Sequence, residues 1–172
     1  YERQFKSGDI RDPLLRMLGC EELDELEDDA RLHILDACFK SNHTKMLKPY
    51  RAYQHLFDLQ AMVEGQGREN VTYLSGQYLA DLLVWYHLVW MGESVRRESE
   101  AAARLMTKGG QFTFAERMEI FDLIGELIAG IIPRYKALSD RGQVEISTTP
   151  YNHPILPLLL DFNSARESEP NA

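Results

Sequence analysis

The side chains that could do chemistry in this sequence are a carboxylate and an imidazole near its C-terminal end, Glu145 and His153. Taken by itself, Glu145 is most simply a solvent-facing residue or a salt-bridge partner, because most exposed carboxylates only solvate a protein surface. His153 stands directly before Pro154, where a helix is expected to begin, so a capping role is as natural as binding a ligand. The residue types alone leave both roles open.

The five histidines and two cysteines are not arranged to hold a metal. No pair of histidines has a ligand spacing such as His-x-x-x-His, and Cys20 and Cys38 do not form a CxxC motif. Two cysteines are also too few for a disulfide framework, which favours reduced thiols and a cytoplasmic protein. We therefore predict no metal and no other cofactor.

Composition and charge exclude several classes of partner. The 172 residues are 44% hydrophobic and 27% charged, as expected of a protein with a packed core. The net charge of −8 repels a polyphosphate backbone, so nucleic acid is not an expected partner. Residues 1–9 lack the apolar region of a signal peptide, and residues 82–91 are about half the ~20 residues that a membrane span needs.

Helical periodicity dominates the chain. From residue 28 to about 40, apolar residues recur at spacings of three and four, with Arg31 placed on the polar face. A Thr113/Glu116 pair predicts a capping box, Pro133 predicts a kink, and Gly142 predicts a left-handed helix end. The further helices are expected at residues 13–18 (capped by Asp12), 49–64, 76–97, 114–141 and 154–160.

One segment follows a different period. Residues 143–149 alternate and are rich in β-formers, which predicts a single short strand. The expected fold is therefore mainly α, with a helical segment at 1–141, a strand-loop-helix unit at 142–161 and a frayed tail at 162–172. Because a lone strand cannot satisfy its backbone hydrogen bonds, we expect its partners in sequence outside this chain.

A long motif around this strand resembles the second signature region of glycoside hydrolase family 57, the amylase and glucanotransferase family. Weaker similarity extends over Asn42 to Tyr53 and Trp85 to Gly92. The motif reads Arg141-Gly142-Gln143-Val144-Glu145-Ile146-Ser147-Thr148-Thr149-Pro150-Tyr151-Asn152-His153-Pro154-Ile155-Leu156-Pro157-Leu158-Leu159.

The resemblance implies an incomplete barrel of seven β/α units that acts on α-glucans by a retaining mechanism with two carboxylates. In such a barrel Glu145 would lie on a strand, and the loop from Ser147 to His153 would reach the sugar-binding cleft. Glu145 and His153 are thus the expected substrate-binding residues. Trp85 and Trp90 could also stack on sugars, but their place in the most apolar helix favours core packing for both.

The sequence departs from the family pattern in its catalytic residues. It contains no His-Gln-Pro element, and the family's nucleophile Glu and acid/base Asp lie on later strands than any in this chain. We therefore expect a piece of a catalytic barrel that is inactive alone and could self-associate through exposed apolar surface. Two alternatives remain: a free-standing helical module that binds another protein, and a sugar-binding relative without catalysis.

Overall fold

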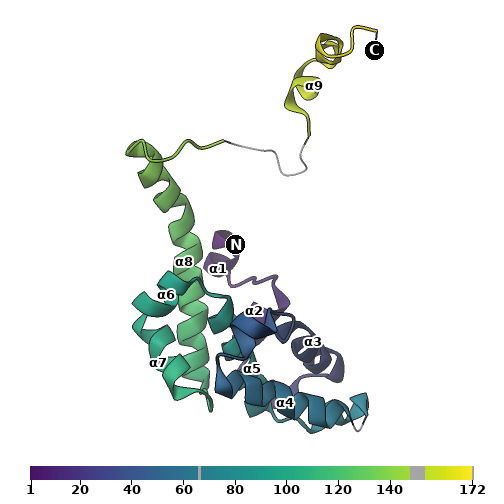
Figure 1. The fold of residues 1–172 in the computed structure, drawn as a ribbon, viewed down its shortest axis with the longest axis vertical. Helices are drawn as coiled ribbons and strands as arrows, with labels where there is room; N and C mark the ends of the chain where they lie inside the picture. The colour runs from purple at the N-terminus through teal and green to yellow at the C-terminus, as the bar shows by residue number, and fades with distance from the viewer. Residues whose placement is uncertain (66, 148–153, 172) are drawn as a thin grey trace. The chain divides into compact units, whose positions relative to one another are not determined.

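Residues 1–65, 67–147 and 154–171 are described by a computed structural model of the chain (Figure 1). The described residues are mainly α-helical, as predicted, and they fall into two compact units. Unit 1 comprises Tyr1–Gly130 and unit 2 comprises Ile131–Ala172. The elements in chain order are α1 (Glu2–Ser7), α2 (Pro13–Leu18), η1 (Leu23–Glu25), α3 (Asp28–Cys38), η2 (His43–Leu47), α4 (Arg51–Glu64), η3 (Arg68–Tyr73), α5 (Gly76–Trp90), α6 (Glu93–Glu98), α7 (Glu100–Lys108), α8 (Phe114–Asp140), α9 (Leu156–Leu160) and η4 (Phe162–Glu167).

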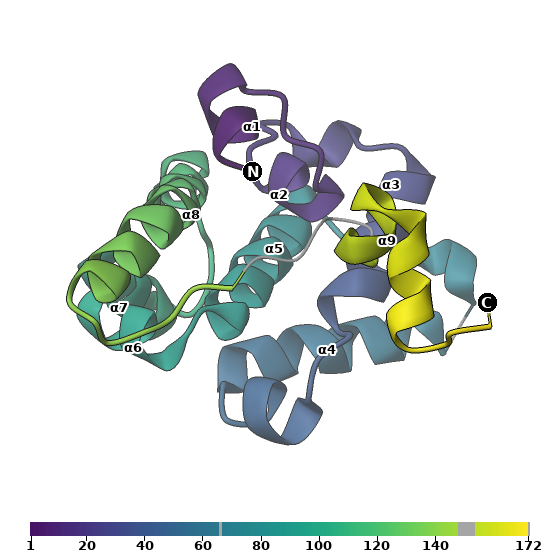
Figure 2. The same ribbon diagram turned by 90° about the horizontal axis from the view of Figure 1, so that it is seen from above.

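Helix α5 is the centre of unit 1. It contacts α2, α3, α4 and α7, and the ribbon views show these helices gathered around it (Figure 2). Leu79, Leu82, Leu83 and Leu88 of α5 are fully buried, as expected for a helix that is apolar on nearly every face. The prediction that this segment forms the middle of the core is confirmed.

The two tryptophans of α5 have different environments. Trp85 is buried and its Nε1 donates a hydrogen bond to the Gly109 carbonyl at 3.0 Å, so its predicted core role is confirmed. Trp90 is 55% exposed, and the prediction of a core role for it is wrong. Five residues along a helix correspond to a rotation of about 140°, which turns Trp90 away from the face that buries Trp85.

Local signals at the helix ends work as expected. The Asp12 carboxylate accepts a hydrogen bond from Leu15 N at 2.9 Å at the start of α2. At the start of α8, Glu116 N donates to Thr113 Oγ1 at 3.3 Å while Thr113 N donates to the Glu116 carboxylate at 2.8 Å. These paired bonds form the capping box that the Thr-x-x-Glu spacing predicts.

Residues 91–108 differ from the prediction. The expected helix over 76–97 ends at Trp90, and α6 starts after Gly92. Helix α7, which we did not predict, begins at Glu100 and is capped by Ser99, whose hydroxyl accepts a hydrogen bond from Ala102 N at 3.3 Å. Its small Ala102 and apolar Leu105 are fully buried, so packing against α5 stabilises a helix with a short sequence signal.

Among the residues of unit 1 whose burial is described, three charged side chains are buried and bind backbone groups. Arg31, 6% exposed, donates to the carbonyls of four residues: Leu23, Asp24, Thr72 and Leu74. Arg117, 4% exposed, donates to the carbonyls of Leu18, Cys20 and Glu21. Asp81 accepts from the backbone N–H groups of Gln111 and Phe112 at 2.8 and 2.9 Å. The prediction that Arg31 lies on the polar face of its helix is therefore wrong.

Unit 2 has no buried residue among its described positions, 131–147 and 154–171. Helix α8 continues through Pro133 to Asp140, so the predicted kink stays a prediction, and α9 follows Pro154 as expected. Residues 143–147 of the predicted strand are not in a strand, and residues 148 and 149 lie outside the described part. A strand requires a hydrogen-bonding neighbour, and within the described residues this segment has none.

We predict that the hydrogen bonds of the buried Arg117 guanidinium contribute strongly to the unfolding free energy of unit 1. Arg117→Met keeps much of the side-chain volume but leaves three carbonyls without their donor, so we expect unfolding to become easier by about 2–4 kcal/mol. Urea unfolding followed by circular dichroism at 222 nm measures this. Arg104→Met is the control, because Arg104 is half exposed and solvent weakens its ion pairs with Glu116 and Glu119. Equal losses in both variants would contradict the prediction.

A second prediction concerns the pH dependence of the capping box. Burial by itself raises the pKa of Glu116, but the Lys108 ammonium and the Thr113 N–H outweigh it and hold the pKa at about 2. The ionised carboxylate therefore stabilises the fold at neutral pH, and this contribution disappears as the pH falls from about 4.5 toward 2. Glu116→Gln should lower the unfolding free energy by about 1 kcal/mol at pH 7 and have little effect near pH 2.

Urea unfolding at pH 7, 5, 3 and 2 tests this dependence. Glu126→Gln is the matched control, since Glu126 is exposed on the same helix and has no ion pair with the described residues. An effect of Glu116→Gln that is constant over the whole pH range would rule out the charge as its cause.

Candidate functional site

The predicted site residue Glu145 lines an open hollow in unit 2. The hollow has a volume of about 780 Å³ and lies between the last turns of α8 and the segment that follows it. Its lining residues are Ile132, Tyr135, Lys136, Ser139, Asp140, Val144, Glu145, Ile146 and Ser147. The other predicted site residue, His153, lies outside the described residues. The structure therefore places one of the two residues and leaves their spacing undefined.

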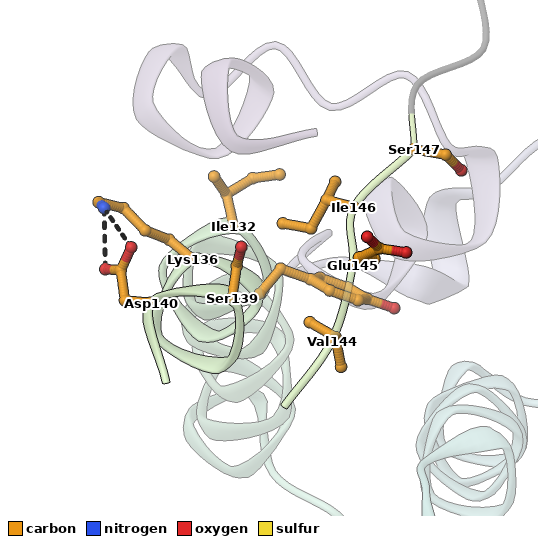
Figure 3. Close-up of a pocket in the computed structure, with 9 residues that line it drawn as sticks. Ile132, Lys136, Ser139, Asp140, Val144, Glu145, Ile146 and Ser147 are labelled. Atoms are coloured by element: carbon orange, nitrogen blue, oxygen red, sulfur yellow. Dashed lines mark hydrogen bonds and ion pairs between the residues drawn. The ribbon is translucent and has the colours of Figure 1, made fainter. Parts of the chain in front are cut away.

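The end of α8 determines where Glu145 lies. Gly142 has φ of 67°, the left-handed conformation predicted for it. Gly142 N donates to the Ser139 carbonyl at 2.9 Å, and Gln143 N donates to the Leu138 carbonyl at 3.0 Å. These two bonds form a Schellman motif, which ends the helix and reverses the chain. Residues 144–147 therefore pass beside the last turns of α8 and line the hollow together with them (Figure 3).

The walls of the hollow combine apolar surface with a few charged groups. The side chains of Ile132 and Ile146 point toward one another across it (Figure 3), and both are exposed. Lys136 forms an exposed ion pair with Asp140 at 2.8 Å. Glu145 is exposed and forms no hydrogen bond or ion pair with the described residues. It is the carboxylate of this hollow that is available to a ligand.

The two carboxylates that line this hollow, Asp140 and Glu145, have different surroundings. A retaining glycosidase needs two carboxyl groups about 5 Å apart, one to attack and one to donate a proton. In the hollow, Asp140 is paired with Lys136, while Glu145 has no partner within the described part of the chain. The geometry is suited to hydrogen bonding of hydroxyl groups beside an apolar wall.

The described residues show neither a metal site nor a membrane-spanning helix. Within the described ranges, no three His, Cys, Asp or Glu side chains are grouped so that they could hold a metal ion. Cys20 and Cys38 are both free, and burial raises the pKa of the Cys38 thiol. Of the helices the structure describes, none is long and apolar enough to cross a membrane.

Comparison with known proteins identifies the class of this chain as a relative of the glycoside hydrolases. The family model of Glycosyl hydrolase family 57 matches residues 23–169, so the chain belongs to that family. Searches of curated proteins and of solved structures found no match. The matched range includes the motif from Gly142 to Leu159, and the resemblance inferred from that motif is confirmed.

Sequence reasoning missed the buried charges that shape unit 1. A signal for Arg31 was present, because it precedes buried Ile34 by three residues and buried Leu35 by four, on the apolar stripe of α3. A charged residue on an apolar stripe indicates a buried ion with an internal partner. Arg117 likewise precedes buried Ile120 by three residues on α8.

We predict that Glu145 has no role in folding of the chain. Glu145→Gln should leave the amide hydrogen exchange of Gly142 and Gln143 unchanged, because the exposed carboxylate makes no bond that supports the turn. Gly142→Ala is the comparison, since a Cβ in the left-handed conformation costs about 1 kcal/mol and should speed exchange about fivefold. Faster exchange in Glu145→Gln would show a structural role instead.

Proposed function

We propose that this chain is part of an enzyme that hydrolyses or transfers α-glucan chains by a retaining mechanism with two carboxylates. In this proposal the helices of unit 1 surround a catalytic barrel, and the segment after α8 supplies one element of the barrel wall. Glu145 and His153 bind sugar in the cleft. The nucleophile and the acid/base are provided by other parts of the enzyme, so the chain is inactive alone.

The observation that carries the proposal is the family match over residues 23–169. A match of this extent includes the helices of unit 1 from η1 onward and the motif that contains Glu145. It identifies a carbohydrate as the substrate class. The α-glucan specificity and the retaining mechanism are what the amylase-like resemblance of that motif implies.

The exposed apolar side chains of unit 2 support a place in a larger fold. Ile132, Ile146, Ile155 and Leu159 are more than half exposed, and Leu160 is 87% exposed. Apolar surface of this kind stabilises a protein only when it is covered, at about 25 cal/mol per Å². Strands and helices of a barrel would cover it, and a neighbouring strand would pair with residues 143–147, which have no strand partner among the described residues.

A cytoplasmic location belongs to the same proposal. It is supported by the two thiols, since Cys20 and Cys38 are both free and Cys38 is buried in the core of unit 1. Reducing compartments keep such thiols in this state.

Activity measurements test the proposal. The 172-residue chain should release no reducing sugar from amylose, because it lacks a catalytic carboxylate pair. In a protein that joins these residues to the family's catalytic carboxylates, Glu145→Gln should lower kcat/KM at least tenfold, whereas Glu126→Gln should leave it unchanged. Turnover by the isolated chain, or full activity of the Glu145→Gln enzyme, would contradict the proposal.

A second candidate function is a helical module that binds another protein. It is favoured by the core of unit 1, which is continuous from Ile10 to Ile120. Sedimentation and thermal unfolding distinguish the two candidates. A stand-alone module should be monodisperse and melt cooperatively, whereas a part of a barrel should associate through the exposed apolar surface of unit 2.

A further inference from the structure

A second hollow lies in unit 1, beside the start of α5. It has a volume of about 340 Å³ and is formed by η1, the first turn of α3 and the turn between η3 and α5. Its lining is mostly polar and includes Asp24, Asp28, Arg31, Thr72, Tyr73 and Ser75. None of these residues belongs to the Gly142–Leu159 motif, and the family resemblance assigns them no role.

Tyr73 is the aromatic residue of this hollow, and its ring is displayed to solvent. The residue is 83% exposed, whereas Leu74 directly after it and Val71 two residues before it are buried. The carbonyls of Thr72 and Leu74, which flank Tyr73 in sequence, both accept hydrogen bonds from Nη2 of the buried Arg31. The Leu74 N–H donates to the Val71 carbonyl at 3.1 Å. These hydrogen bonds fix the backbone on both sides of Tyr73 from the protein interior, while the Tyr73 ring remains exposed to solvent.

The remaining walls of the hollow are equally well fixed. The Asp24 carboxylate accepts a hydrogen bond from the Gly76 N–H, and a Cβ at Gly76 would lie 2.5 Å from Asp24 Oδ2. This close approach requires glycine at the first residue of α5. Arg31 is 6% exposed, and its Nε has no hydrogen-bond partner among the described residues. A buried donor without a partner is typical of a site that is completed by a ligand or by water.

The chemistry of the hollow selects one class of ligand. The Asp24 and Asp28 carboxylates disfavour an anion, and the described residues provide no group of three acidic, histidine or cysteine ligands for a metal cation. Asp28 makes no hydrogen bond or ion pair with the described residues, so its oxygens are available as acceptors. An aromatic face beside carboxylate and hydroxyl oxygens matches the apolar face and hydroxyl groups of a sugar ring.

We propose that this hollow is a binding site for a neutral oligosaccharide, with the Tyr73 ring stacked on one sugar and Asp28 accepting hydrogen bonds from its hydroxyl groups. For its ligand class, the inference rests on the proposed function. The substrate of that enzyme is a long α-linked chain, which can contact the protein outside the catalytic cleft. A site on unit 1 would hold a polymeric substrate on the enzyme between catalytic events and raise its local concentration.

Titration of the 172-residue chain with maltoheptaose, followed by amide NMR shifts and calorimetry, tests the site. Shift changes are expected at residues 72–76 and at Asp28. Tyr73→Ala should weaken binding at least tenfold, while Tyr73→Phe, which keeps the ring, should stay within about threefold of the unsubstituted chain. Tyr1→Ala is the control, because Tyr1 is 70% exposed in the same unit but does not line the hollow.

The outcomes separate this inference from the proposed function. Unchanged affinity in Tyr73→Ala, or shift changes confined to residues 143–147, would overturn the oligosaccharide site and leave the enzymatic proposal standing. Loss of binding in Tyr73→Ala with retained binding in Glu145→Gln would support the site independently of the cleft. The catalytic proposal is decided by turnover of the longer protein, in which Tyr73→Ala should raise KM for amylose and leave kcat for a short maltooligosaccharide unchanged.

Discussion

The structure of unit 1 depends on buried guanidinium groups that bind backbone carbonyls rather than carboxylates. Arg31 and Arg117 together hold the connection from Leu18 to Asp24, which links α2 to α3 with little secondary structure of its own. A planar guanidinium with five donors can satisfy several carbonyls at once, which a hydrophobic residue of the same volume cannot do. The carbonyls of this irregular segment are thus paired, although several of its side chains are exposed.

The same interaction connects folding to recognition in unit 1. By holding the carbonyls of Thr72 and Leu74, Arg31 also fixes the backbone that displays Tyr73. Because the backbone around Tyr73 is fixed before a ligand arrives, less conformational entropy is lost on binding. Asp81 provides a related support for the loop before α8 through the N–H groups of Gln111 and Phe112. One physical device, a buried charge bound to backbone, therefore organises three loops around α5.

Unit 2 represents the opposite situation, because its local structure is well specified while its packing is not. The Schellman motif at Gly142 and the short helix α9 are formed by bonds between neighbouring residues. Its isoleucines and leucines remain exposed, and the segment with strand composition has no neighbouring strand in the described residues. In the enzyme that we propose, further elements of the catalytic domain would cover this apolar surface.

The sequence by itself determined the features that depend on a few adjacent residues. These include the capping box at Thr113, the left-handed Gly142, the apolar helix α5 and the family motif around Glu145. Tertiary structure decided the burial of Arg31, the exposure of Trp90 and the absence of strand pairing at residues 143–147. Helix caps are satisfied within one turn, whereas Arg117 and the Leu18 carbonyl are 99 residues apart. A contact over that separation depends on how all intervening helices pack, and no local pattern encodes it.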